Sequence, residues 1–181
     1  AYKFLKLKIA ISTNEAIYFA KNIELEDLNN PELRSESCGN LASRLAGCDR
    51  IRKELILFQR NFPNKKIGAV LDGRDIGSII FPNAKIKFFI TADLAVRAQR
   101  RKEDYKKMGQ EYSLRDITNK LKERDKRDQT RKVSPLICMP DAIVYDNSKT
   151  PFERLNKEII EIVEKKYKSL NLDINVKKPV K

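Results

Sequence analysis

Histidine is absent from the 181 residues of this chain. It is the commonest general base, a frequent metal ligand, and the partner of serine or cysteine in nucleophilic pairs. Its absence therefore excludes Ser-His and Cys-His chemistry. We expect any reaction here to depend on the positioning of charged side chains.

Cysteine is scarce, and its three positions are Cys38, Cys48 and Cys138. An odd number of cysteines without a Cys-x-x-Cys pair indicates neither a disulfide framework nor a zinc site. We expect three free thiols in a reducing compartment, and the sequence suggests no set of metal ligands.

Long apolar runs are absent as well. No stretch of the sequence reaches the roughly 20 apolar residues that a membrane-spanning helix needs. The N-terminus shows no basic region followed by an apolar stretch and a cleavage site, so no secretory signal is predicted. We therefore expect a cytoplasmic protein that does not contact membranes.

Charge is abundant instead. Charged residues make up 35% of the chain, hydrophobic residues 41%, and the formal net charge is +13. Such a surface attracts anions through a salt-sensitive field, whether they are nucleotides, nucleic acids or acidic lipids. Charge alone does not choose among them. The length favours a single domain, 1–181, with its own core.

The apolar pattern alternates between strands and helices. Short apolar runs predict strands buried on both faces of a sheet at 67–72, 85–92 and 141–146. Helical spacing predicts helices at 2–11, 14–23, 41–47, 50–62, 93–108, 113–131 and 153–167. Expected caps are Ser12 or Thr13, Asp49, and a capping box of Ser113 and Asp116. This order predicts an α/β fold with a parallel sheet flanked by helices. Three strands are few for such a sheet, so we expect part of it to be missing from the sequence.

A Gly-Arg-Asp motif follows the first predicted strand, where ligands bind in doubly wound sheets. Gly73 and Gly77 allow a sharp turn, Arg74 offers a fork of donors to a phosphate, and Asp75 can accept from amino or hydroxyl groups or hold an arginine. The alternative is an ordinary turn with a surface ion pair.

A second charged motif is "LKERDKRDQTRK" in the predicted helix 113–131. Arg124, Asp128 and Arg131 follow at i, i+4 and i+7, so one helical face presents two guanidiniums beside a carboxylate, with Arg127 close by. This face could hold phosphates and hydroxyls. The alternative is a solvated helix with surface salt bridges.

Three segments in this order, 71–101, 121–136 and 141–148, resemble bacterial cytidylate kinases, and segment 32–60 is similar to the part of that family before its Gly-Arg-Asp motif. The resemblance runs from Glu32 to Tyr167. It implies a P-loop nucleoside monophosphate kinase fold, with a segment that binds the nucleoside monophosphate at 23–62, a lid at 97–115 and a basic tail at 169–181. It also implies transfer of a phosphoryl group from ATP to CMP or dCMP, giving CDP or dCDP and ADP, with Mg²⁺ as cofactor. The expected enzyme is a cytoplasmic monomer of pyrimidine metabolism that binds no specific nucleic acid.

The resemblance also implies roles for individual residues. Arg74 would bind the CMP phosphate and Asp75 the cytosine amino edge, while Ser43 and Arg52 would help to read the base. Asp128 would bind the ribose hydroxyls. Three further groups complete the expected site: Arg124 and Arg131 on phosphate, with Arg131 also near the base, and the lid arginines Arg100 and Arg101 on the transferred phosphoryl group.

The sequence departs from the family in several respects, and one of them concerns ATP binding. The family begins with a strand and a Gly-x-x-x-x-Gly-Lys-Ser/Thr loop for ATP phosphates, and no such motif occurs here. Without its lysine and Mg²⁺-binding hydroxyl, phosphoryl transfer should fail. We therefore expect this chain to be part of a longer protein. The alternatives are a nucleotide-binding protein without enzymatic activity and a basic RNA-binding module.

Overall fold

The computed structural model describes residues 13–63 and 68–169. Its longer helices are α2 (Thr13–Lys21), α3 (Glu36–Leu45), α4 (Asp49–Asn61), α5 (Leu94–Lys107), α6 (Leu114–Thr130) and α7 (Phe152–Ser169). Two 3-10 turns, η1 (Glu26–Asn29) and η2 (Pro31–Arg34), precede α3, and a short π-helix, η3 (Ile76–Ile80), follows the Gly-Arg-Asp motif. The strands are β1 (Phe88–Thr91) and β2 (Ile143–Asp146).

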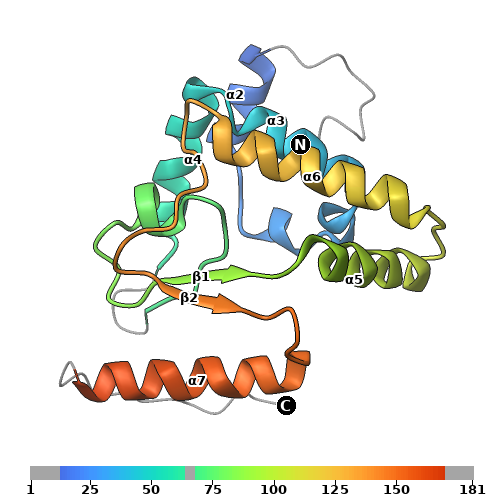
Figure 1. The fold of residues 1–181 in the computed structure, drawn as a ribbon. Coiled ribbons are helices and arrows are strands. Elements are labelled where there is room, and N and C mark those ends of the chain that lie inside the picture. Colours follow the sequence, from blue (N-terminus) through green and yellow to red (C-terminus); the bar gives the residue numbers. More distant parts are fainter. Residues whose placement is uncertain (1–12, 64–67, 170–181) are drawn as a thin grey trace.

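The two strands form a parallel pair, which confirms the predicted α/β fold with a parallel sheet. Phe88 lies opposite Ile143, and Thr91 lies opposite Asp146. Figure 1 shows α7 along one side of this pair and helices α2, α3, α4 and α6 on the other side. The Tyr145 hydroxyl of β2 donates to the Glu158 carboxylate, which attaches α7 to the sheet.

The predicted strand at 67–72 is wrong. Residue 67 lies outside the described residues, residues 68–72 form no strand, and the Val70 side chain is 99% exposed. A buried strand needs a neighbour for its backbone N–H and C=O groups and a packed layer over each face. In the described part of the chain the sheet consists of β1 and β2 alone, and within 68–72 only Gly68 takes part in an isolated β-bridge.

The helix predictions agree better with the structure. Ser113 caps α6, because its Oγ accepts from the Asp116 N–H at 3.0 Å and donates to the Asp116 carboxylate at 2.7 Å. The expected cap Asp49 is wrong, since Cys48 is the N-cap of α4 and Asp49 is its first helical residue, paired with Lys53 at 2.9 Å. Ser12, the helix at 2–11 and the tail beyond 169 lie outside the described residues.

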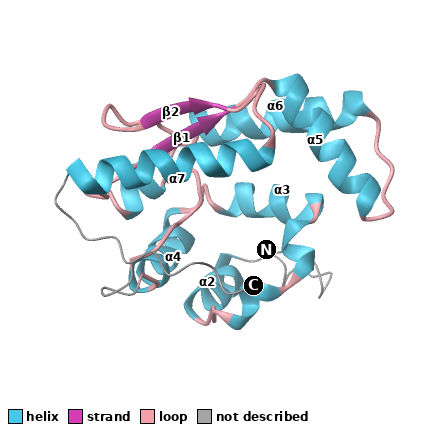
Figure 2. Ribbon diagram, turned by 90° about the horizontal axis from the view of Figure 1, so that it is seen from below, coloured by secondary structure: helices cyan, strands magenta, loops and turns pink. Residues whose placement is uncertain are grey.

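Two small apolar clusters join the helices in pairs. Ala16 and Ala20 of α2 pack on Ile51 of α4, and a second cluster of Ala98, Tyr105 and Ile117 joins α5 to α6. Figure 2 shows these pairs in different parts of the molecule. Within the ranges described, no helix combines the length and apolar character needed to cross a membrane.

Candidate active site

A buried carboxylate, Asp128, lies at the centre of the candidate site. It projects from the last turn of α6, and only 2% of its surface is exposed. Its Oδ1 accepts from Ser43 Oγ at 2.8 Å and from Arg131 Nη1 at 3.4 Å, and its Oδ2 accepts from Arg74 Nε at 3.3 Å. Arg124 Nε lies 3.9 Å from Oδ2. A charge this deeply buried is stable only when it is paired in this way.

A second buried ion pair joins Asp75 to Arg52. Asp75 is 3% exposed and Arg52 is 7% exposed, so both charges are held away from water. Arg52 belongs to α4, whereas Asp75 ends the Gly-Arg-Asp motif and precedes η3. The alternative that the Gly-Arg-Asp motif is an ordinary turn with a surface ion pair is therefore wrong.

The arginines outnumber the carboxylates at this site. Arg52, Arg74, Arg124 and Arg131 face only two buried carboxylates. Burial lowers the pKa of Arg124, and the guanidinium of Arg74 lowers this pKa further. Burial likewise lowers the pKa of Arg52, with a smaller effect from Arg131. Excess positive charge in a partly buried cluster attracts an anionic ligand.

Two of these guanidiniums carry donors that no described residue satisfies. Arg52 Nε and Arg124 Nε are buried and make no hydrogen bond within residues 13–63 and 68–169. Buried polar groups in folded proteins nearly always have a partner. Both donors therefore point to a ligand acceptor atom at the site.

The loop after α6 sets the position of Arg131. Arg131 Nε donates to the Ser134 carbonyl at 2.7 Å, and the Leu136 N–H donates to the Asp128 carbonyl at 2.7 Å. Ser134 is buried and has a φ of 49°, in the left-handed region that residues other than glycine rarely adopt. Strained backbone of this kind often lies at functional sites.

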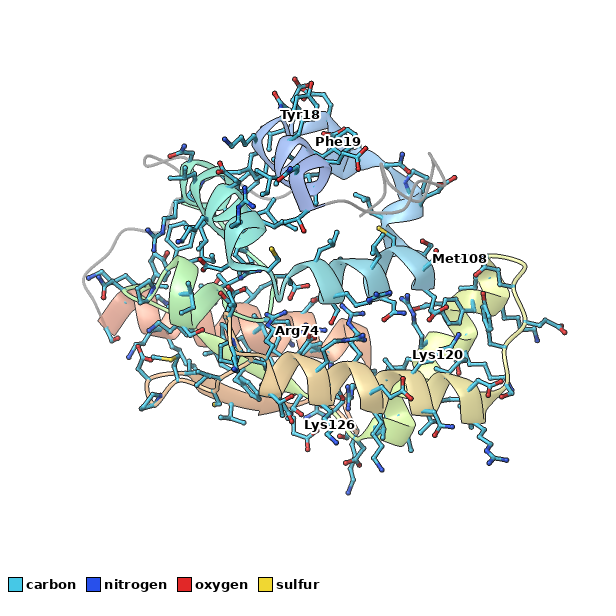
Figure 3. All side chains as sticks on the ribbon, turned by 90° about the horizontal axis from the view of Figure 1, so that it is seen from above. Tyr18, Phe19, Arg74, Met108, Lys120 and Lys126 are labelled. Atoms are coloured by element: carbon cyan, nitrogen blue, oxygen red, sulfur yellow. The ribbon has the colours of Figure 1, made fainter. Side chains whose placement is uncertain are left out.

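Arg74 approaches Asp128 from the loop before η3, and its side chain is 42% exposed. Figure 3 shows Arg74 in the middle of the molecule, between the helices that contribute the other site residues. An arginine that is paired on one side and open to solvent on the other can still bind a ligand phosphate through its free donors.

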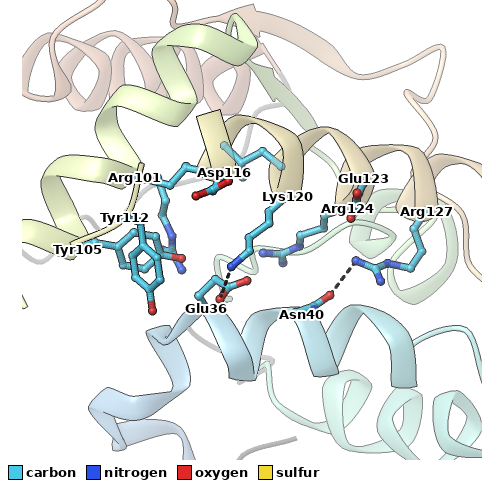
Figure 4. Close-up of a pocket in the computed structure, with 12 residues that line it drawn as sticks. Glu36, Asn40, Arg101, Tyr105, Tyr112, Asp116, Lys120, Glu123, Arg124 and Arg127 are labelled. Carbon is cyan, nitrogen blue, oxygen red and sulfur yellow. Dashed lines mark hydrogen bonds and ion pairs between the residues drawn. The ribbon is translucent and has the colours of Figure 1, made fainter. Parts of the chain in front are cut away.

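The lid arginines lie in different surroundings. Arg100 donates to the side chain and carbonyl of Asn147, at 3.0 and 2.8 Å, in the loop after β2. Arg101 lies over the Tyr105 ring, with Cζ 4.7 Å from the ring centroid. The structure thus places Arg101 and Arg124 along the same cleft (Figure 4). Arg100 is instead bound to the loop after β2.

A cleft of about 170 Å³ separates α3 from α5 and α6 and leads toward Arg124 (Figure 4). Lys120 pairs with Glu36 at 3.2 Å, and Arg127 Nη2 donates to Asn40 Oδ1 at 2.9 Å. The sequence patterns did not identify Glu36, Asn40 or Lys120. No local spacing could have done so, because α3 and α6 are far apart in the chain.

Comparison with known proteins identifies the family of this chain. The sequence model of the cytidylate kinase family matches residues 3–165. A cytidylate kinase of Cereibacter sphaeroides is 40% identical over 145 residues, covering 80% of this chain and 70% of the relative. One of Bartonella tribocorum is 42% identical over 154 residues, covering 84% of this chain and 72% of the relative. This chain therefore belongs to the cytidylate kinase family, whose members are enzymes of the nucleoside monophosphate kinase class.

Proposed function

We propose that the protein to which this chain belongs, when it carries the family's ATP-binding loop, transfers the γ-phosphoryl group of ATP to the phosphate of CMP or dCMP, giving CDP or dCDP and ADP. A phosphate oxygen of the acceptor attacks the γ-phosphorus, the bond to the β-phosphate oxygen breaks, and ADP leaves. The single observation that carries the proposal is the arrangement of two buried carboxylates among four arginines, which combines groups for a base, a sugar and a phosphate.

The base would bind at the Arg52–Asp75 pair. Cytosine presents an amino donor beside ring-nitrogen and carbonyl acceptors. The Asp75 carboxylate can accept from the amino group, while the unsatisfied Arg52 Nε can donate to an acceptor of the ring. Uracil presents a carbonyl where cytosine has its amino group, and this carbonyl would face Asp75 acceptor to acceptor. Because both groups are buried, such a mismatch would not be relieved by water.

The sugar would bind at Asp128. A carboxylate offers about four lone-pair sites, and Asp128 already accepts from Ser43, Arg74 and Arg131. One acceptor site remains for a ribose hydroxyl. In this role Ser43 would hold the Asp128 carboxylate and complete the wall beside the base.

The phosphate would bind among Arg74, Arg124 and Arg131. Their guanidiniums converge on Asp128 from two segments of the chain, and Arg124 Nε makes no hydrogen bond within the described residues. Phosphoryl transfer depends mainly on positioning and on stabilisation of the spreading negative charge. Arginines already fixed by buried contacts supply both.

The segment 23–62 would then carry the base-binding side of the site, and the lid would be 97–115. We propose that Arg101, which lines the cleft, acts on the transferred phosphoryl group. Arg100 would have to leave its bonds to Asn147 to reach the same group. Arg101 already lines the cleft together with Arg124.

Mg²⁺ is proposed to enter with the phosphates of ATP. Across the described ranges, no three His, Cys, Asp or Glu side chains gather into a possible metal site. The two buried carboxylates at the site are both paired with arginine, so they do not fit as Mg²⁺ ligands. We therefore assign no protein ligand to the ion. We also propose that the enzyme works in the cytoplasm as a monomer.

The test is a coupled assay with MgATP in which CMP, dCMP, UMP and AMP are compared as acceptors, together with calorimetric binding of each nucleotide. We expect CMP and dCMP to bind and react best. Equal or better binding and turnover with AMP would rule out a cytidylate kinase. In a protein that carries the family's ATP-binding loop, binding of CMP without turnover would favour a nucleotide-binding protein that is not an enzyme.

A further inference from the structure

Arg60, near the end of α4, binds the backbone of η3 with two of its nitrogens. Its Nε donates to the Ile80 carbonyl at 3.1 Å, and its Nη2 donates to the Ile79 carbonyl at 3.0 Å. The last carbonyls of a helix have no partner within that helix. Arg60 therefore satisfies two backbone acceptors that η3 leaves open, and none of the roles proposed above uses this arginine.

The helix η3 begins directly after Asp75. The Asp75 carbonyl accepts from the Ile79 and Ile80 N–H groups at 2.9 and 3.2 Å, and the Ile76 carbonyl accepts from the Phe81 N–H at 2.7 Å. Such wide turns are rare and often lie at functional sites. The direction of the Asp75 side chain thus depends on the shape of this single turn.

Helix α4 contacts both ends of this turn. At one end Arg52 pairs with the Asp75 carboxylate, and at the other end Arg60 binds the carbonyls of Ile79 and Ile80. Positions 52 and 60 are eight residues apart and so fall on one i, i+4, i+8 row of the helix. Ile80 is 2% exposed, so the second contact is anchored in packed structure.

We propose that Arg60 is a positioning residue for the nucleotide base: it fixes η3 and thereby holds the Asp75 carboxylate where an acceptor for the cytosine amino group is needed. This inference rests on the function proposed above. An arginine suits this role because its planar fork meets the two carbonyls from two nitrogens in a fixed geometry, whereas the three donors of lysine all extend from one nitrogen on a flexible stem. A binding group displaced by even a small distance loses much of its selectivity.

The experiment compares Arg60→Lys and Arg60→Ala with wild type, and uses Arg50→Ala as a matched control that also removes one exposed positive charge from α4. Amide hydrogen exchange of Ile79, Ile80 and Phe81 without nucleotide tests whether Arg60 fixes η3. Calorimetric binding of CMP and UMP tests its consequence without any need for turnover.

We expect faster exchange at these three amides in both Arg60 variants. CMP should bind about three- to tenfold more weakly in Arg60→Lys, and more weakly still in Arg60→Ala, as the two hydrogen bonds are lost in turn. The ratio of CMP to UMP affinity should fall in the same order. Arg50→Ala should match wild type in every measurement.

Two results would overturn the inference. If exchange at Ile79 and Ile80 stayed at the wild-type rate in Arg60→Lys, Arg60 would not fix η3. If exchange rose while CMP affinity and the CMP-to-UMP ratio stayed unchanged, Arg60 would serve stability alone. Failure of the proposed function looks different, because wild type itself would then show no preference for CMP. Should Arg60→Ala fail to fold, Arg60→Lys alone decides.

Discussion

Ser43 and Asp128 are 85 positions apart in the chain, and the Ser43 hydroxyl donates a 2.8 Å hydrogen bond to Asp128 Oδ1. The bond joins α3 to α6. Arg74, from the loop before η3, donates to the other oxygen of the same carboxylate. One buried carboxylate thus brings three separate segments to a common point, and a ligand bound there would contact all of them.

Asp75→Asn should reduce the preference for CMP over UMP. The amide keeps the size of the side chain, removes its charge and adds a donor that suits the uracil carbonyl. A good polar contact contributes roughly 1–3 kcal/mol, or about one to two orders of magnitude in specificity. Arg74→Ala is the matched comparison and should weaken CMP and UMP alike, because both carry the same phosphate. An unchanged CMP-to-UMP ratio in Asp75→Asn would leave this residue only a structural role beside Arg52.

Asp128→Asn should destabilise the fold strongly. It leaves the buried guanidinium of Arg131 without its carboxylate partner, and breaking a buried ion pair costs roughly 3–5 kcal/mol. Asp49→Asn is the control, since its ion pair with Lys53 is exposed and should contribute less than about 1 kcal/mol. Urea unfolding measures both free energies. An equal loss of unfolding free energy in the two variants would show that the buried ion pair of Asp128 stabilises the fold no more than an exposed one.

Ser134→Gly and Ser134→Val should have different effects. Glycine adopts a positive φ freely, so Ser134→Gly should leave stability and CMP binding nearly unchanged. Valine is branched at Cβ and should cost roughly 1–3 kcal/mol at this backbone conformation. It should also weaken CMP binding, because the Ser134 carbonyl holds Arg131. Thermal unfolding and calorimetry check both effects, and a tolerated valine would show that the loop has another stable conformation.

Asp141 should contribute to stability in a pH-dependent way. A hydrogen bond from the buried Lys87 ammonium, at 2.7 Å, lowers the pKa of Asp141 below its ordinary value of 3.8. A carboxyl group with a lowered pKa in the folded state stabilises the fold above its unfolded pKa and loses that effect as pH falls through the folded value. Asp141→Asn should therefore be less stable than wild type at pH 6, with the difference shrinking as pH falls below about 4. Urea unfolding from pH 6 to pH 3 measures it, with Asp72→Asn as an exposed control. A difference that did not shrink at all between pH 6 and pH 3 would contradict this assignment.

The protein should bind structured RNA only weakly, despite its net charge of +13. Binding that depends on phosphate contacts weakens steeply as salt rises, by orders of magnitude when several contacts are involved. Fluorescence anisotropy at 50 and 200 mM salt, each with and without CMP, would measure this loss and show competition by the nucleotide. Tight, sequence-selective RNA binding that resisted salt would favour the RNA-binding alternative.

Much of the fold could be predicted from local patterns. The capping box at Ser113 and the helical spacing of α4 and α6 depend on neighbours within one turn, so the sequence contains the necessary information. The strand at 67–72 could not be decided in this way. Its apolar residues are suited to a strand, but strand formation requires hydrogen-bond partners from distant parts of the chain.

The sequence by itself determined which residue types were available to the site. Without histidine, and with arginines and aspartates at helical spacing on α6, recognition had to rest on guanidinium and carboxylate groups. Motif order was enough to indicate the family and to name Arg74, Asp75, Arg124, Asp128 and Arg131. Only the tertiary structure decided which charges pair with which. Asp75 pairs with Arg52, Ser43 with Asp128, and Arg60 with the backbone after Asp75. These contacts form because α4 packs on η3 and α3 packs on α6, and contacts between distant segments have no periodic signal in the sequence.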